Sequence, residues 1–173
     1  IILFLGEAGA GKSTLCNSIF GQVVFKSGLS LSPSTTTVKQ EHIHEGKLYI
    51  DTPGFNEVGI GDRVAKAIDE ALKYNNNYKI VFVVKPDAGL ILTKGVVDGI
   101  NEICNAIKTN FEYGIVFTKF SKKRIRKMNQ QGAFDQEKLH ETSYMPRQLM
   151  KFPTLTVVLE ENQDLQDEDN KYL

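Results

Sequence analysis

Short apolar stretches alternate along this chain with longer segments in which apolar residues recur every three or four positions. The apolar stretches lie at 1–5 (IILFL), 79–84 (KIVFVV), 113–117 (YGIVF) and 155–159 (LTVVL). An apolar run of this kind, bounded by polar or turn residues, is typical of a strand that is buried on both faces. These segments are therefore predicted to be the central strands of a sheet.

The segments between the strands predict helices. Residues 12–20 are predicted to be the helix that follows the first strand, and apolar residues at helical spacing mark 62–74 and 95–107 as helices that bury one face. The polar and basic segment 121–150 is expected to hold helix around a loop. The acidic tail after the last strand is expected to begin one more helix, cut short at residue 173.

Between the first two of these helices the pattern changes. Residues 21–37 are rich in Gly, Ser, Thr and Pro, which predicts a loop. Residues 37–44 and 47–50 then alternate between apolar and polar positions on either side of Glu45-Gly46. Two alternating stretches joined by two such residues predict a β-hairpin.

The order of these elements predicts one α/β domain over residues 1–173. Strands separated by helices need crossover connections, and these give a mostly parallel sheet with helices on both faces, three layers in all. The hairpin adds one antiparallel strand at an edge. Ligands of such sheets bind at the carboxyl ends of the strands, so the loops that follow the strands are the expected place of the functional site.

Composition excludes several classes of protein. The chain has 41% hydrophobic residues, 24% charged residues and a net charge of zero, so no overall field favours nucleic acid or an anionic membrane. No apolar run reaches the roughly 18–20 residues that span a bilayer. Cys16 and Cys104 stand far apart, which suits a reducing compartment, and we expect the cytoplasm. The chain starts on a strand without a Met, which we interpret as a piece of a longer protein.

The loop after the first strand carries the clearest chemistry. It reads GEAGAGKST and fits G-x-x-x-x-G-K-[ST] between a strand and a helix. Glycines let successive backbone N–H groups converge on phosphate oxygens, and the start of the helix adds partial positive charge. Lys12 is expected to reach the β- and γ-phosphates, and the Ser13 hydroxyl to bind Mg²⁺. The predicted phosphate-binding residues are Gly6, Glu7, Ala8, Gly9, Ala10, Gly11, Lys12, Ser13 and Thr14.

A second loop follows the hairpin, where the sequence reads LYIDTPG. An Asp at the end of a buried strand, about 40 residues after a phosphate loop, is typical of the Walker B residue that holds Mg²⁺. Asp51 is therefore expected to hold Mg²⁺ through a water molecule, and Gly54 to offer its backbone N–H to a γ-phosphate. A loop with that contact responds to which nucleotide is bound.

In this order the motifs resemble those of translation-factor-class GTPases. Within that class, GKSTLCNSIFG, SLSPSTTTV and IDTPGFNE are most similar to the septin-like and immunity-associated GTPases, of the GIMAP and avirulence-induced-gene type. The resemblance is good over residues 1–120 and poor over 121–173. It implies a P-loop G domain that binds GTP and GDP with Mg²⁺ and acts as a molecular switch or assembly module. It also implies a switch Thr that binds Mg²⁺ and the γ-phosphate, with Thr35 favoured and Thr36 next.

The same resemblance bears on hydrolysis, for which the predicted catalytic residues are Lys12, Thr35 and Gly54. Related switch GTPases place a Gln shortly after this Gly to orient the attacking water, but here Phe55 follows. Because a phenyl ring cannot hold water by a hydrogen bond, we expect slow turnover, aided by Asn56 or Glu57 or by a second protomer across the nucleotide face. Two alternatives stay open: an oligomerising scaffold that binds nucleotide without hydrolysis and, more distantly, a small-molecule kinase.

The base site departs from the family pattern at residues 117–121, which read FTKFS. The family carries [NT]-K-x-D here, and its Asp selects guanine; Thr118 and Lys119 are present, but Ser121 replaces the Asp. Lys119 is expected to lay its aliphatic stem on the base. A hydroxyl cannot replace a carboxylate that accepts two hydrogen bonds, so a nucleoside triphosphatase of relaxed base preference is an alternative. Another acceptor after the last strand could compensate, namely Glu160, Glu161 or Asn162, of which Asn162 matches best.

Two further clusters have plainer interpretations. His42 and His44 lie on one face of a strand and, without a third ligand nearby in the sequence, are interpreted as surface residues. The basic cluster after residue 121 is interpreted as a solvated helix face, although anionic lipid, nucleic acid or an acidic partner would also fit it. We expect no specific binding of nucleic acid. The basic cluster comprises Lys122, Lys123, Arg124, Arg126 and Lys127.

Overall fold

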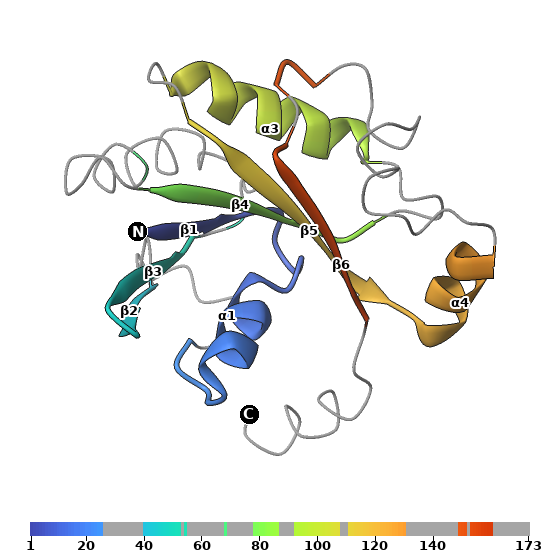
Figure 1. Ribbon diagram of the computed structural model, residues 1–173. Coiled ribbons are helices and arrows are strands. Elements are labelled where there is room, and N and C mark those ends of the chain that lie inside the picture. The colour runs from blue at the N-terminus through green and yellow to red at the C-terminus, as the bar shows by residue number, and fades with distance from the viewer. Residues whose placement is uncertain are drawn as a thin grey trace.

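The computed structural model describes residues 1–25, 40–52, 54, 68, 78–86, 92–107, 111–130, 149–151 and 153–160. Within these residues one six-stranded sheet forms the centre, in the order β2-β3-β1-β4-β5-β6 (Figure 1). Every neighbouring pair of strands is parallel except β2 and β3, which confirms the predicted fold class. The strands are β1 (Ile2–Leu5), β2 (Gln40–His44), β3 (Lys47–Asp51), β4 (Lys79–Val84), β5 (Tyr113–Phe120) and β6 (Leu155–Glu160). The described helices are α1 (Lys12–Phe20), α3 (Lys94–Ala106) and α4 (Lys122–Gln130).

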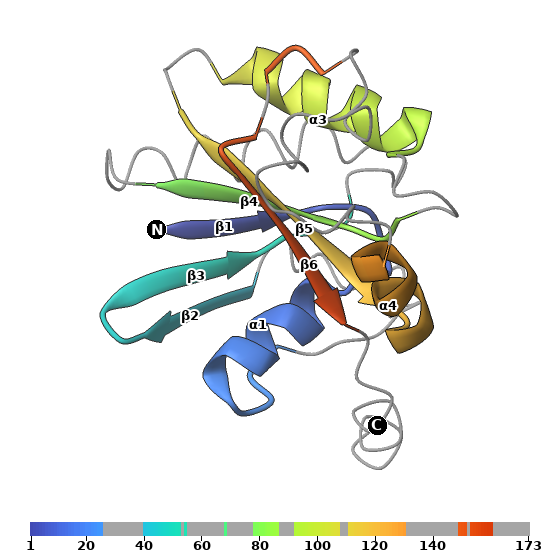
Figure 2. The same cartoon turned by 45° about the vertical axis from the view of Figure 1, so that its right-hand side comes forward.

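Helices cover both faces of the sheet. α1 lies against one face and α3 against the other, while α4 continues from the end of β5 at the side of the molecule (Figure 2). Two separate clusters of buried side chains correspond to the two faces. The larger cluster includes Phe82, Ile100 of α3 and Phe117. The smaller cluster includes Phe4 and Cys16 of α1.

α1 begins directly from the phosphate loop. Gly11 precedes it in the left-handed region, with φ 93°, a conformation that favours a residue without a Cβ. The buried residues of the helix are Lys12, Cys16 and Phe20, and their spacing of four places them on one face. Gly21 ends the helix, again in the left-handed region.

α3 begins with a side-chain cap. The Thr93 hydroxyl oxygen accepts a hydrogen bond from the backbone N–H of Val96 at 3.3 Å. The buried residues of the helix are Val96, Val97, Ile100 and Ile103, so the apolar stripe predicted for this segment faces the core. Among the described residues, no helix is long and apolar enough to cross a membrane.

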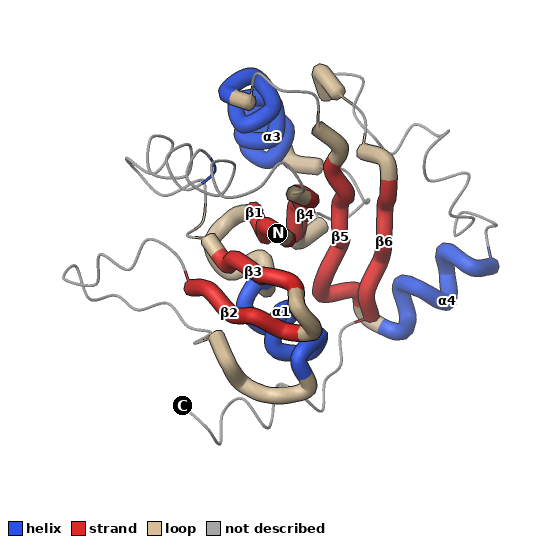
Figure 3. The backbone as a smooth tube through the Cα atoms, turned by 60° about the vertical axis from the view of Figure 1, so that its left-hand side comes forward, coloured by secondary structure: helices blue, strands red, loops and turns tan. Residues whose placement is uncertain are grey.

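β2 and β3 form the predicted hairpin at one edge of the sheet (Figure 3). Glu45 and Gly46 both have positive φ, 47° and 72°, the combination that a type I′ turn requires. The two strands pair from His44 and Lys47 onward. β3 then runs parallel to β1 and ends at Asp51, so this residue arrives beside the end of the first strand.

β5 is longer than predicted. The sequence predicts its end at Phe117, whereas the structure continues it to Phe120. Phe120 is fully buried and packs edge-on against Phe117, with ring centroids 6.4 Å apart. Burial of a large aromatic side chain stabilises the additional residues as strand, so the segment expected to be a loop is partly sheet.

Some predicted elements lie outside the described residues. Of the predicted helix 62–74 only Ile68 is described, as a buried helical residue of the larger cluster. Of the segment 121–150, α4 and the last residues are described. The loop residues 26–37 and the tail from 161 onward are not among the described residues.

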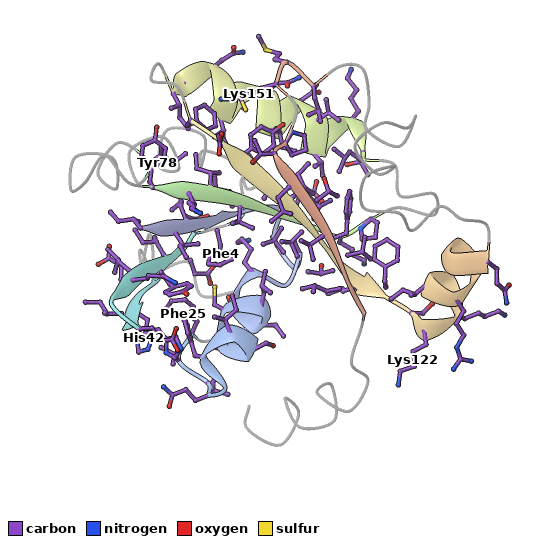
Figure 4. The ribbon with its side chains drawn as sticks, in the orientation of Figure 1. Phe4, Phe25, His42, Tyr78, Lys122 and Lys151 are labelled. Atoms are coloured by element: carbon purple, nitrogen blue, oxygen red, sulfur yellow. The ribbon has the colours of Figure 1, made fainter. Side chains whose placement is uncertain are left out.

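The two histidines of β2 are half-buried, so they are less exposed than the predicted surface position implies. The Phe20 ring at the end of α1 covers them, with ring centroids 4.8 Å from His42 and 5.2 Å from His44. Figure 4 shows His42 close to Phe25 on the α1 side of the sheet. The pattern of one strand could not reveal this because the covering ring comes from another element. Within the part of the chain that is described, no three His, Cys, Asp or Glu side chains gather as a metal site.

Candidate functional site

The phosphate loop lies at the carboxyl end of β1, near the middle of the sheet (Figure 1). Its glycines are needed for different reasons. A Cβ at Gly6 would overlap the carbonyl oxygen of Val83 in β4, because the loop passes too close to that strand for any side chain. Gly9 and Gly11 have φ of 71° and 93°, in the left-handed region. The loop therefore turns sharply into α1, which leaves the first N–H groups of the helix at the loop.

Lys12 is folded back over this loop. Its side chain is 7% exposed, and Nζ donates hydrogen bonds to the carbonyl oxygens of Gly6 at 3.2 Å and Glu7 at 3.0 Å. A buried ammonium group needs such acceptors. The two bonds hold a positive charge at the loop, where the charged oxygens of a phosphate would be stronger acceptors than carbonyl groups.

Ser13 and Asp51 bring a second loop to the first. Ser13 Oγ donates to Asp51 Oδ2 at 2.5 Å, although the residues are 38 positions apart in sequence. Asp51 is 5% exposed, and Oδ1 has no hydrogen-bond partner among the described residues. Burial raises the pKa of Asp51 above 3.8, while the Ser13 hydrogen bond and the Lys12 charge offset part of that rise. A buried carboxylate with one unsatisfied oxygen beside a hydroxyl group is suited to a cation.

These two side chains fit Mg²⁺ in particular. The ion prefers oxygen ligands and is usually held by one or two protein groups, with water and substrate phosphates as its other ligands. The Ser13 hydroxyl and the Asp51 carboxylate supply oxygens of this kind, and the unsatisfied Oδ1 is the observation that supports the fit. Thr35, the third predicted ligand, lies outside the described residues.

The segment after β3 is fastened to both β1 and the phosphate loop. Thr52 Oγ1 donates to the carbonyl oxygen of Phe4 at 2.8 Å. Gly54 lies so near the loop that a Cβ there would overlap the backbone nitrogen of Ala8 and come within 2.8 Å of its Cα. This contact restricts residue 54 to glycine. The predicted γ-phosphate sensor therefore lies directly against the predicted phosphate-binding loop.

Thr118 connects the phosphate loop to β5. The hydroxyl is buried and donates to the carbonyl oxygen of Ala10 at 2.6 Å, with that of Val84 as a longer partner at 3.4 Å. The sequence marks Thr118 as a nucleotide-binding residue but does not reveal this bond, whose partner is 108 positions away. A Thr near the end of a buried strand is the only signal that the sequence contains for it.

The base end of the site is built on an irregularity in β5. Between Phe117 and Phe120 the pairing with β6 shifts register, since two residues of β5 lie opposite one of β6. Lys119 lies in this bulge, with φ 59° and an exposed side chain. Ser121 is also exposed, and its carbonyl oxygen accepts a hydrogen bond from the N–H of Ile125 at 3.1 Å, which begins α4.

The predicted site residues that are described therefore gather at one end of the sheet. Asp51 and Gly54 lie on the β3 side of the phosphate loop, and Lys119 lies on the β5 side, in the strand order β3-β1-β4-β5. The residues predicted or weighed for the site that lie outside the described part of the chain are Thr35, Thr36, Asn56, Glu57, Glu161 and Asn162.

Asn17 is a supporting residue that the sequence analysis missed. Its Oδ1 accepts hydrogen bonds from the backbone N–H groups of Val24 at 2.9 Å and Phe25 at 2.8 Å, and its Nδ2 donates to the Phe25 carbonyl at 2.8 Å. The side-chain amide thereby fastens the segment that leads from α1 toward the predicted switch Thr. An Asn inside a short helix, where its propensity is low, was the available signal.

A family model described as 50S ribosome-binding GTPase matches residues 1–119. Among curated relatives, the small ribosomal subunit biogenesis GTPase RsgA 2 of Vibrio vulnificus is 39% identical over 67 residues, which are 35% of this chain and 19% of that protein. The RsgA protein of Methanosarcina acetivorans is 31% identical over 109 residues, 57% of this chain and 30% of that protein. The chain thus spans less than a third of the length of either relative.

Solved structures show the same fold. Toc33 from Arabidopsis thaliana, in complex with GDP and Mg²⁺, has a TM-score of 0.54 at 19% identity, with 94% of this chain and 70% of that chain covered. The complex of SsGBP and GDP has a TM-score of 0.50 at 15% identity, with coverage of 99% and 48%. At these identities the likeness concerns the fold alone.

The family match begins at β1 and runs through the phosphate loop, Asp51 and Lys119. It confirms the class of protein that the motifs predict, whereas the septin-like and immunity-associated subfamily stays a prediction. Because the match covers well over half of the 173 residues, the chain belongs to the 50S ribosome-binding GTPase family.

Proposed function

We propose that this domain binds GTP and GDP with Mg²⁺ and hydrolyses GTP slowly, as a molecular switch or assembly module. The observation that carries the proposal is the hydrogen bond between Ser13 and Asp51, with Asp51 Oδ1 left unsatisfied in the interior. A cation site directly beside a phosphate loop is what a nucleoside triphosphate needs. The family match supports guanine as the base.

Each group at the phosphate loop has a role in the bound state. The N–H groups of the loop and of the start of α1 bind the phosphates. Lys12 Nζ exchanges the carbonyl oxygens of the loop for phosphate oxygens. Ser13 and Asp51 hold Mg²⁺, which when bound neutralises charge on the β- and γ-phosphates. The Gly54 N–H donates to the γ-phosphate, so the segment after β3 responds to its presence.

Slow hydrolysis follows from the residue after Gly54. Phe55 offers no hydrogen bond to an attacking water, and a second protomer across the nucleotide face is proposed to supply the missing group. Dimerization is described as important for the GTPase activity of the chloroplast translocon components atToc33 and psToc159, whose structure has a TM-score of 0.52 to this chain at 16% identity. That likeness concerns the fold and serves here as motivation for the test.

Subfamily and location are part of the same proposal. GKSTLCNSIFG, SLSPSTTTV and IDTPGFNE support a septin-like or immunity-associated GTPase. Both described cysteines are free, which is consistent with a reducing compartment such as the cytoplasm.

Titration of the protein with fluorescent GDP, in Mg²⁺ and in EDTA, tests the cation site. We expect Mg²⁺ to tighten binding to the wild type. Ser13→Ala and Asp51→Asn should lose this effect of Mg²⁺ while they still bind nucleotide in EDTA. Ser18→Ala is the matched control, because Ser18 is an exposed serine of the same helix and its hydroxyl donates to the Thr14 carbonyl oxygen within α1. Wild-type binding that is indifferent to Mg²⁺ would contradict the cation site.

Single-turnover hydrolysis at increasing protein concentration tests the catalytic part. A slow rate that rises with concentration is expected if a second protomer completes the site. A fast rate that does not depend on concentration would contradict both the slow switch and the dimer. Binding without turnover at any concentration would favour the alternative, an oligomerising scaffold.

A further inference from the structure

Ser121 is exposed and lies between the end of β5 and the start of α4. The backbone there is fixed from both sides. Phe120 before it is fully buried in the core. After it, the Ser121 carbonyl oxygen accepts the N–H of Ile125 at 3.1 Å, in the first turn of α4. A side chain at position 121 therefore starts from the same place whatever its type.

The relation of this position to the phosphate loop is constrained as well. Thr118 bonds to Ala10 of the loop at 2.6 Å, and only the bulge at Lys119 separates Thr118 from the buried Phe120. Lys119 and Ser121 are the exposed residues that follow Thr118. If phosphates bind in the loop, as the proposed function requires, the base of the same nucleotide is expected beside them. The inference rests on the proposed function in this respect.

The 6-oxopurines differ from one another chiefly at position 2, and xanthine also carries a hydrogen atom on N3. Guanine has an amino group there, hypoxanthine a hydrogen atom and xanthine a carbonyl oxygen. Recognition of the amino group together with N1–H takes an acceptor with two oxygens, which a carboxylate supplies. Ser121 has a single hydroxyl oxygen, which accepts one such bond or donates to a carbonyl oxygen equally well.

The positive charge around Ser121 favours a base that presents hydrogen-bond acceptors, such as carbonyl oxygens, to this position. Lys119, Lys122, Lys123 and Arg126 are all exposed and lie within five positions of it. Figure 4 shows Lys122 at the start of α4. The first turn of this helix contains no acidic residue. Positive charge attracts the carbonyl oxygens of a base and repels its N–H groups.

We propose that the site accepts 6-oxopurine nucleotides as a class and does not require the 2-amino group of guanine. Inosine nucleotides bind about as tightly as guanosine nucleotides, because no carboxylate at position 121 reads the group that inosine lacks. Xanthosine nucleotides bind at least as tightly, because they present a carbonyl oxygen at position 2. Adenosine nucleotides bind less tightly, because an amino group replaces O6.

Ser121 lies directly before α4 and its carbonyl oxygen accepts the first bond of the helix, so it occupies the N-cap, where Ser, Asp and Asn are all favoured. A carboxylate just before a helix interacts favourably with the helix dipole and, here, with the cations of the first turn. Ser121→Asp is therefore expected to fold as the wild type does, and it supplies the missing two-oxygen acceptor. Ser121→Asn is the matched control, since it has a similar size and an amide in place of the charge. Thermal unfolding of both variants checks that the fold is kept.

Calorimetric titration with the Mg²⁺ complexes of GDP, IDP, XDP and ADP tests the inference on the wild type and both variants. For the wild type we expect GDP and IDP affinities within about threefold of each other, and ADP weaker by about tenfold or more. For Ser121→Asp we expect GDP to gain over IDP by about 10- to 100-fold, the range of a charged hydrogen-bonded pair. Ser121→Asn should show no such gain.

Each contrary result has a separate meaning. Wild-type protein that binds GDP at least tenfold more tightly than IDP would overturn the inference, and another carboxylate such as that of Glu160 or Glu161 would then read the amino group. Equal affinities for ADP and GDP would overturn it too, because O6 would not be read. If no nucleotide binds, and Lys12→Ala is indistinguishable from the wild type, the proposed function fails instead.

Discussion

The phosphate end and the base end of this site differ in how much of their geometry exists before a ligand binds. At the phosphate end, Lys12 and Thr118 each bond to carbonyl groups of the loop, and Asp51 is buried beside it. At the base end, the side chains of Lys119 and Ser121 are exposed. One end is a rigid arrangement of bonded groups, and the other is a surface.

This difference indicates where affinity and where specificity arise. Groups that are already held in place contribute affinity because the ligand does not have to order them. Exposed long side chains lose conformational entropy when they bind, which reduces their contribution. We therefore expect strong binding of the phosphates and weak discrimination among bases. The following predictions test this comparison, in order of decreasing effect.

The largest expected difference is between the two lysines of the site, Lys12 and Lys119, in how much GDP affinity each contributes. Lys12→Ala is expected to weaken GDP binding by about 100-fold or more, because it removes a charge-assisted contact from a preformed site. Lys119→Ala is expected to weaken it by about threefold, because only an exposed stem is lost. Fluorescent GDP titration measures both, with Lys94→Ala, an exposed lysine of α3, as control. Equal effects of Lys12→Ala and Lys119→Ala would remove the distinction between the two ends.

The next largest effect is expected at the contact between Gly54 and Ala8 of the phosphate loop, where an added side chain should lower the stability of the fold. Gly54→Ala places a Cβ against the backbone of Ala8, and overpacking of this kind costs about 1–3 kcal/mol of stability. Gly114→Ala is the control, because its Cβ would lie 3.4 Å from the nearest atom, the carbonyl oxygen of Leu155. Urea unfolding compares the two variants. A Gly54→Ala protein as stable as the wild type would show that this contact is loose.

The bond from β5 to the phosphate loop should have a moderate effect. Thr118→Val keeps the shape of the side chain but leaves the carbonyl oxygen of Ala10 without its donor, at a cost of about 1–2 kcal/mol. Thr154→Val serves as control, since the Thr154 hydroxyl donates to the Tyr113 carbonyl from an exposed residue and over 3.2 Å. Urea unfolding without nucleotide measures the loss of stability of both variants. If the control loses as much stability as Thr118→Val, the phosphate end is not specially held by this bond.

The smallest expected effect is a pH dependence of folding stability that comes from the buried carboxyl group of Asp51. The pKa of Asp51 is raised above 3.8 in the folded state by burial. The folded protein then holds this proton more tightly than the unfolded chain does, so stability falls as pH rises from 3.8 through the folded pKa. In EDTA, the Asp51→Asn protein should not show this decrease in stability with rising pH. Urea unfolding of both proteins from pH 4 upward measures it, and identical pH profiles would contradict it.

Much of the phosphate end could be predicted from the sequence because its signals are local. The strand, the glycine spacing and the Lys12-Ser13 pair occupy consecutive positions, and Asp51 directly ends an apolar strand. The mostly parallel direction of the strands also followed from the alternation of strands and helices. These features depend on the backbone path of single segments, which short-range patterns determine.

The remainder depends on contacts between distant segments. The Thr118 hydroxyl meets the loop only because β4 and β5 pair in the observed register. Phe120 extends β5 because its ring enters a core formed by other elements. The histidines of β2 are half-buried because Phe20 reaches them from α1. No pattern within one segment contains such information.

The bond between Thr118 and Ala10 has a consequence for synthesis of the chain. β1 lies in the interior of the sheet, and the strands that follow it are added first on one side and then on the other. The phosphate loop is made before those strands, and its anchor in β5 comes 108 positions later. At a ribosomal rate of about 5–20 residues per second, the loop waits on the order of 5–20 seconds for that anchor. Nucleotide binding is thus acquired only after β5 has been made, when most of the strands of this sheet have emerged.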